Sequence, residues 1–188
     1  MARAFGTQWY GGVAMETIRV HEFESPVGRI KLGSTEKGLC WLELPGSAGR
    51  GFAGWLRAQL PDAEVVEDEA PNRSTKEQVL AYLAGERLHF ELPLDLRATP
   101  FQHTVYEELL AIPYGETRSY AEVARRIGKP RAVRATGTAN GANPIPLVIP
   151  CHRVIAADGG LGGYGGGLAL KRRLLAMESA RVRSGGLL

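Results

Sequence analysis

Residues 119–139 read SYAEVARRIGKPRAVRATGTA and carry the signature of two short helices joined by a tight turn. Ser119 and Glu122 form a capping box, and the apolar residues after them keep helical spacing as far as Gly128. Lys129-Pro130 then turns the chain into a second helix over residues 131–139. This pattern is typical of a helix-turn-helix, although short helical hairpins also occur in proteins that never bind DNA.

The second of these helices is thin and basic. Small side chains alternate in it with two arginines, so that it could approach a phosphate backbone or enter a groove. We therefore expect a DNA-binding surface made of Arg131, Ala132, Arg134, Ala135 and Thr136. The alternative is tight packing of the alanines inside the domain, with the arginines simply solvated.

Towards the N-terminus, a third helix is expected to begin at Pro100. Thr99 and Gln102 form its capping box, apolar residues line one face, and Pro113-Tyr114-Gly115 ends it. The segment before it, residues 91–98, has the pattern of an extended connection. We therefore place a domain boundary near Arg97, with one domain over residues 16–96 and a second, mostly helical domain over residues 97–180.

The first domain has the pattern of a small α/β unit. Apolar residues alternate from Glu16 to Leu44 and are interrupted at glycine-containing turns, which predicts a strand meander. Helical spacing over residues 52–60 follows, and a capping box formed by Ser74 and Glu77 predicts another helix up to Gly85. Cys40 lies in an alternating strand and is interpreted as a small core residue.

The charges of the two halves differ in sign. Residues 1–96 hold ten Lys and Arg against 14 Asp and Glu, whereas residues 97–188 hold 13 against six, so the net charges are −4 and +7. A basic half is what a polyanion-binding face requires, although charge alone would equally suit a solvated surface. Residues 1–15 and 181–188 are predicted to be flexible tails. No membrane-spanning or signal segment is apparent, and unpaired cysteines favour a cytoplasmic protein.

The densest chemical signal runs from Asn143 to Val154, with the sequence NPIPLVIPCHRV. Three prolines stiffen this stretch, and an apolar run would bury it, which places Cys151 and His152 on a rigid extended strand. A neighbouring His or Arg, such as Arg153, or a helix N-terminus would lower the pKa of the thiol and make it a nucleophile. Side chains alternate along a strand, so we do not expect His152 to touch Cys151 directly.

These motifs together resemble the O6-alkylguanine-DNA alkyltransferases (methylated-DNA–protein-cysteine methyltransferases). The resemblance rests on the PCHRV string, the upstream Asn143-Pro144, the IPYGET stretch at residues 112–117 and the Tyr164-Gly165-Gly166-Gly167 loop. It covers the C-terminal half closely and the N-terminal half loosely, through elements such as Ser25-Pro26-Val27-Gly28. It implies an α+β protein with an N-terminal ribonuclease H-like domain and a C-terminal winged helix-turn-helix domain.

The resemblance also implies an activity: irreversible, single-turnover repair of O6-alkylguanine, and of O4-alkylthymine, in double-stranded DNA by a monomer without a cofactor. Cys151 would accept the alkyl group, His152 would act through a water as its base, Glu178 would polarise the histidine, and Asn143 would brace the turn. The flipped base would be bound by side chains or backbone groups of Tyr120, Pro146, Val154, Tyr164 and Gly165. Arg134 would fill the gap in the duplex.

Three alternatives remain open from the sequence. A damage sensor could bind alkylated DNA without accepting the alkyl group, and a winged-helix transcription regulator could use Cys151 to sense alkylation or oxidation. The glycine-rich loop over residues 159–167 could also be a plain surface loop. Some members of the family bind zinc in the N-terminal domain, but Cys40, His21 and His89 make a weak ligand set, and no metal is expected.

Overall fold

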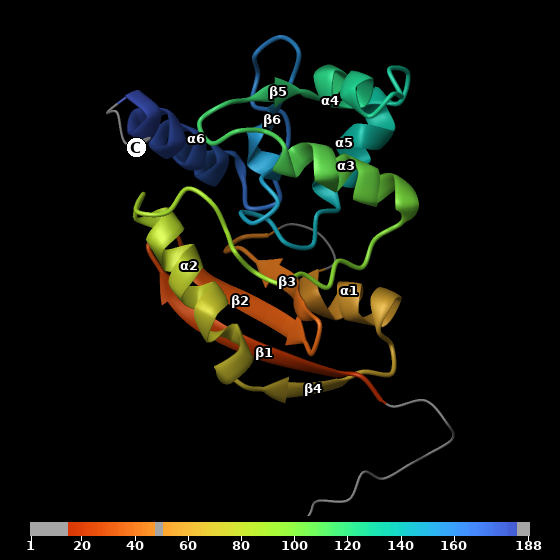
Figure 1. The fold of residues 1–188 in the computed structure, drawn as a ribbon, viewed down its shortest axis with the longest axis vertical. Coiled ribbons are helices and arrows are strands. Elements are labelled where there is room, and N and C mark those ends of the chain that lie inside the picture. Colours follow the sequence, from red (N-terminus) through yellow and green to blue (C-terminus); the bar gives the residue numbers. More distant parts are fainter. Residues whose placement is uncertain (1–14, 48–50, 184–188) are drawn as a thin grey trace, which may run out of the picture.

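The computed structural model describes residues 15–47 and 51–183. The N-terminal half holds a four-stranded sheet in the order β3-β2-β1-β4 (Figure 1). Strands β1 (Thr17–Ser25), β2 (Gly28–Thr35) and β3 (Gly38–Glu43) form the predicted antiparallel meander. Strand β4 (Glu64–Glu67), which the sequence analysis did not predict, pairs parallel to β1.

Helices cover both faces of this sheet. Helix α1 (Gly51–Gln59) packs on the face of Ile18, Val20 and Cys40, and the longer α2 (Arg73–Leu83) packs on the other face. The predicted capping box of Ser74 and Glu77 is wrong, because a short 3₁₀ helix, η1 (Ala70–Asn72), leads directly into α2. Asn72 occupies the N-cap position, and its side chain binds Ser34 and the carbonyl oxygen of Arg19 instead of capping the helix.

The C-terminal half is mostly helical, as predicted. It contains α3 (Pro100–Leu110), α4 (Tyr120–Arg126), α5 (Val133–Gly141) and α6 (Leu168–Arg183). The capping boxes at Thr99 and Ser119 are both present. Two short parallel strands, β5 (Arg118–Ser119) and β6 (Val154–Ile155), join the region before α4 to the segment after Cys151.

Two further expectations need correction. Cys151 lies in a single turn of 3₁₀ helix, η2 (Cys151–Arg153), and not in an extended strand, since Pro150 and the backbone bond from Arg153 to Pro150 close a tight turn. The proposed C-terminal tail begins too early, because α6 continues through residues 181–183. Residues 184–188 and residues 1–14 of the proposed N-terminal tail lie outside the described residues.

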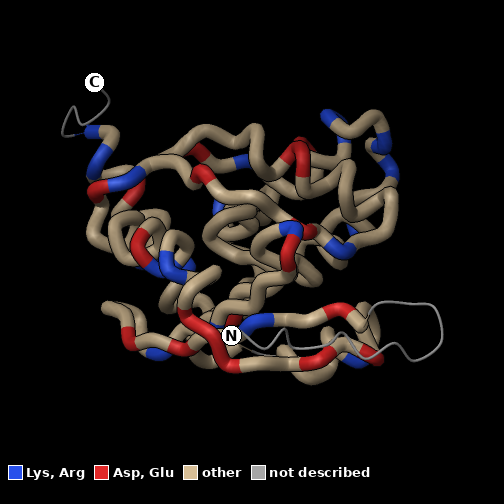
Figure 2. Tube along the Cα trace, turned by 60° about the horizontal axis from the view of Figure 1, so that its bottom comes forward, with Lys and Arg blue, Asp and Glu red and all other residues tan. Residues whose placement is uncertain are grey.

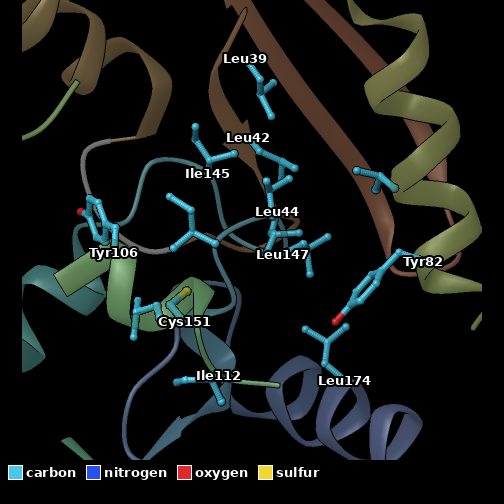
Figure 3. Close-up of a cluster of buried hydrophobic side chains, with 14 of the residues drawn as sticks. Leu39, Leu42, Leu44, Tyr82, Tyr106, Ile112, Ile145, Leu147, Cys151 and Leu174 are labelled. Carbon is cyan, nitrogen blue, oxygen red and sulfur yellow. The ribbon is translucent and has the colours of Figure 1, made fainter. Parts of the chain in front are cut away.

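The two halves share one continuous hydrophobic core. Leu39, Leu42 and Leu44 of the sheet region pack towards Ile145 and Leu147, next to Cys151 (Figure 3). The backbone N–H of Leu42 also donates to the carbonyl oxygen of Pro144 at 2.9 Å. The N-terminal sheet therefore supports the segment that carries Cys151. No described helix is long and apolar enough to cross a membrane.

Candidate functional site

A cavity of about 520 Å³ lies against Cys151 and opens between the two halves of the molecule. This volume lies within the usual range of small-molecule sites, roughly 300–1,000 Å³. Its wall is built from α4, α5, the segment after α5 and the glycine-rich loop. On that side it comprises Tyr120, Gly137, Asn140, Gly141, Ala142, Asn143, Pro146, Cys151, Gly163, Tyr164, Gly165 and Gly166. The N-terminal half contributes aromatic residues, including Trp41 and Trp55.

Cys151 is almost completely buried, with 5% of its surface exposed. Burial raises the pKa of its thiol to about 11, although the Asn143 side chain, Lys171 and nearby backbone N–H groups act in the opposite direction. The expectation that Arg153 would lower this pKa is wrong, because its guanidinium points away to Glu178 and to the carbonyl oxygen of Ile112. The thiol is therefore protonated near neutral pH and needs a base before it can attack.

Asn143 stabilises the turn that precedes the cysteine. Its side chain donates to the carbonyl oxygen of Ile149 at 2.8 Å and accepts from the N–H of Ile145 at 3.0 Å. Leu147, between these two residues, is the one described non-glycine residue with positive φ, at 72°. Such a conformation is unfavourable for leucine. The asparagine side chain therefore spans the strained turn, and the bracing role that the family resemblance implies for it stays a prediction.

His152 and Glu178 form a completely buried pair beneath the cysteine. His152 Nε2 lies 2.8 Å from Glu178 Oε1, and Arg153 and the backbone N–H of Gly115 both donate to Glu178 Oε2 at 2.9 Å. Burial opposes ionisation of the carboxyl, but its hydrogen bonds and charge interactions with His152 and Arg153 prevail and hold the pKa of Glu178 well below its usual range. Burial also lowers the pKa of His152. The pair is therefore a carboxylate beside a neutral imidazole.

The free nitrogen of this imidazole is Nδ1. Among the described residues it has no hydrogen-bond partner, although it is buried. Because Nε2 faces the carboxylate, the proton belongs on Nε2 and the lone pair on Nδ1. No hydrogen bond is present between the imidazole of His152 and the sulfur of Cys151, although the two residues lie in a 3₁₀ turn and not in the extended strand on which that expectation rested. A proton would therefore pass between them through an intermediate donor such as water.

Two buried side chains that contact this site were not identified in the sequence analysis. Lys171 of α6 is fully buried, and its ammonium donates to the carbonyl oxygens of Val154, Leu161 and Gly163. It thereby ties the glycine-rich loop to the body of the domain, so this loop is held in place at its base. Tyr82 of α2 reaches Glu178 and His152 from the other half of the molecule. Neither residue lies in a motif, and a buried lysine or helix tyrosine gives no signal in the sequence.

The structure brings most of the expected base-binding residues to the cavity wall. Tyr120, Pro146, Tyr164 and Gly165 all line it. Gly162 also packs tightly against the Tyr120 ring, where an added Cβ would lie 3.0 Å from the hydroxyl oxygen. Val154 does not line the cavity, because it is buried behind it and its carbonyl oxygen accepts from Lys171.

The proposed DNA-binding residues lie at the start of α5 and in the turn before it. Arg131, Arg134 and Ala135 are exposed, and Ala132 is half-buried. Thr136 is fully buried and faces the interior of the domain. Figure 2 shows lysines and arginines gathered at the end of the C-terminal half that carries this turn. The exposed arginines therefore form a positively charged edge, and Gly137, one turn further along α5 than Arg134, lines the cavity.

Comparisons with known proteins follow the same division into two parts. Residues 18–96 match the family model described as "6-O-methylguanine DNA methyltransferase, ribonuclease-like domain", and residues 100–180 match "6-O-methylguanine DNA methyltransferase, DNA binding domain". Among the described residues, no group of three or more His, Cys, Asp or Glu side chains is placed to hold a metal ion.

Individual relatives agree with the family models. A methylated-DNA–protein-cysteine methyltransferase of Mycolicibacterium paratuberculosis is 60% identical over 162 residues, which are 86% of this chain and 92% of the relative. One from Methanosarcina barkeri is 45% identical over 85% of this chain and 96% of the relative. A crystal structure of Mycobacterium tuberculosis OGT in complex with DNA is similar with a TM-score of 0.75 and 42% identity, covering 88% of this chain and 94% of that one.

Proposed function

The chain belongs to the 6-O-methylguanine DNA methyltransferase family, and on this basis we propose that it repairs DNA by moving the alkyl group of O6-alkylguanine onto Cys151. The observation that carries the proposal is the position of the thiol. Cys151 lies against a cavity large enough for a purine, with a neutral His152 and an ionised Glu178 behind it. O4-alkylthymine is proposed as a second substrate.

The damaged base has to leave the duplex to reach this buried thiol, at a cost of roughly a few kcal/mol. We propose that α5 binds DNA at the edge formed by Arg131, Arg134 and Ala135, and that the flipped base enters between Tyr120 and the glycine-rich loop. Phosphate contacts, together with an arginine in the space that the base leaves, would offset this cost without recognising a particular DNA sequence.

We also propose that the boundary between the two domains lies at Arg97.

The proposed reaction is a substitution at the alkyl carbon. His152 takes the proton of Cys151 at Nδ1 through a water, and the sulfur forms a bond to the alkyl carbon as the bond from that carbon to O6 breaks. The electron pair goes to O6, and the restored guanine, which stays in its DNA strand, takes up a proton from solvent, while His152 returns the proton of Cys151 to solvent. A stable thioether remains on Cys151, so each molecule reacts once.

Since Cys151 must stay reduced, we propose a cytoplasmic location.

Mass spectrometry of the digested protein tests the proposal. After incubation with a methylated oligonucleotide, the peptide containing Cys151 is expected to gain one methyl group, and an unmethylated oligonucleotide serves as the control. Cys40 provides an internal control, because it is fully buried in the other core cluster and burial raises its pKa to about 12. A methyl group on Cys40, or on no cysteine, would contradict the assignment.

The pH dependence of transfer tests the role of His152. If the buried imidazole is the base, the rate should be constant from the pKa of His152, below 6.5, up towards the pKa of Cys151 at about 11. It should fall only at lower pH, where His152 becomes protonated. If bulk hydroxide forms the thiolate instead, the rate would rise about tenfold per pH unit across the neutral range. Single-turnover rates with free O6-benzylguanine distinguish the two profiles.

A further inference from the structure

We propose that Tyr82, a residue of the N-terminal half, is a positioning residue of the transfer reaction that fixes the tautomer of His152 and limits its basicity. This inference rests on the proposed function, because it assigns a part in the same reaction. It also gives the N-terminal half a direct role in the chemistry.

The geometry places three groups in mutual contact. The hydroxyl of Tyr82 donates to Glu178 Oε1 at 2.5 Å and lies 3.2 Å from His152 Nε2, while His152 Nε2 lies 2.8 Å from the same Oε1. Figure 3 shows the Tyr82 side chain extending from α2 with its hydroxyl directed towards α6, next to Leu174. The two residues behind the cysteine are therefore held from the opposite half of the molecule.

Tyr82 is fixed in this orientation and remains a donor. Its side chain is fully buried, and its ring packs against Phe90, with centroids 5.1 Å apart, and edge-on against Tyr114 at 6.2 Å. Burial and the charge of Glu178 raise the pKa of Tyr82 well above its usual value. The phenol therefore keeps its proton throughout the pH range in which the protein is expected to work.

Since the phenol proton points at Glu178, only a lone pair of the hydroxyl oxygen can face His152. Nε2–H then has two acceptors, Tyr82 Oη and Glu178 Oε1, which keeps the proton on Nε2 and leaves Nδ1 as the base. Donation by Tyr82 also draws on the charge of the carboxylate, so that Glu178 stabilises a protonated His152 less than it would alone.

Other groups around His152 act on its charge as well, and they set the background for any change at Tyr82. Glu178 and Lys171 face it from α6, Arg153 and Cys151 lie beside it in η2, and the Tyr164 ring packs edge-on against it at 6.2 Å. Glu178 favours the protonated form, while Arg153, Lys171 and burial oppose it. Removing the Tyr82 hydroxyl leaves all of these groups in place, so the change it causes can be assigned to that hydroxyl.

The test is Tyr82→Phe, with Tyr114→Phe as the matched control. Tyr114 is a neighbouring buried tyrosine whose hydroxyl has no hydrogen-bond partner among the described residues, so both variants lose the same group. In Tyr82→Phe the pKa of His152, followed by nitrogen NMR of labelled histidines, should rise by on the order of one unit. The low-pH limb of the transfer rate should move upward by the same amount, whereas the affinity for duplex DNA should stay unchanged.

A second variant is expected to shift the pKa of His152 in the opposite direction. Replacing Tyr82 by a fluorinated tyrosine with a more acidic hydroxyl keeps its size and strengthens the donation, so the pKa of His152 should fall. The proposal is overturned if Tyr82→Phe titrates like wild type and Tyr114→Phe, if the shift has the wrong sign, or if both Tyr82 variants fail to fold while the control folds. The NMR titration needs no alkyl transfer. If the wild-type protein gains no benzyl group on Cys151 after incubation with O6-benzylguanine, that result would therefore contradict the proposed function and not the role of Tyr82.

Discussion

Replacing Cys151 with serine is expected to reduce alkyl transfer on the order of 10⁴-fold or more, below detection in most assays. The serine hydroxyl fits the same space but is a much weaker nucleophile, and His152 is too weak a base to ionise it. Because the side chain changes by a single atom, the free energy of unfolding should change by no more than about 1–2 kcal/mol. Transfer is measured as label moved from a methylated duplex to the protein.

Cys40→Ser is the matched control for this variant. Cys40 is also buried, but its thiol donates to the carbonyl oxygen of Gly33 in the sheet and is not part of the cavity wall. The Cys40→Ser variant should transfer the alkyl group at the wild-type rate. The Cys151→Ser variant should bind methylated duplex DNA with the affinity of the wild type. Wild-type repair by Cys151→Ser would refute the acceptor assignment. Loss of DNA binding together with transfer would show that the variant is misfolded.

The sequence predicted those parts of the fold that depend on local interactions. The boxes at Thr99 and Ser119 satisfy backbone N–H groups three residues away, so a short window contains all the information. The box at Ser74 failed because a long-range contact changed the helix start. Asn72 binds Ser34 and Arg19, which are far away in the sequence. Strand β4 was missed for a related reason, since its four residues are exposed and only their pairing with β1 defines the strand.

The candidate site divides in the same way. Cys151 and His152 lie in one motif and were proposed from it, whereas the roles of Asn143 and Glu178 followed from the family resemblance. Tyr82 and Lys171 could not be identified, because their roles arise only when α2 and α6 pack around η2. The reactivity of the thiol was also misjudged from its neighbours in sequence. Arg153 is adjacent to Cys151 in the chain, yet its charge is used by Glu178, and burial dominates at the sulfur.

Arg134→Ala is expected to slow repair within duplex DNA by about 100-fold or more, because a flipped base costs a few kcal/mol and about 1.4 kcal/mol corresponds to a factor of ten. Arg134 is exposed on the first turn of α5, one turn before Gly137 of the cavity wall, and we expect its side chain to enter the space that the base vacates. Free O6-benzylguanine needs no flipping. Its reaction with Cys151 should therefore remain within about twofold of wild type.

Comparing duplex DNA with free O6-benzylguanine distinguishes an effect on base flipping from an effect on the transfer step. The Arg125→Ala variant then distinguishes an effect on base flipping from the loss of one positive charge. Arg125 is an exposed arginine in the last turn of α4, so its replacement removes one positive charge from the same half of the protein. If Arg134 acted only through phosphate attraction, both variants would lose similar amounts of duplex repair, and added salt would diminish the difference from wild type. If the Arg134 side chain instead occupies the space left by the flipped base, only Arg134→Ala should lose more in repair rate than its loss of affinity for duplex DNA explains. An equal loss on duplex and free base would instead place Arg134 in the folding of α5 or of the cavity.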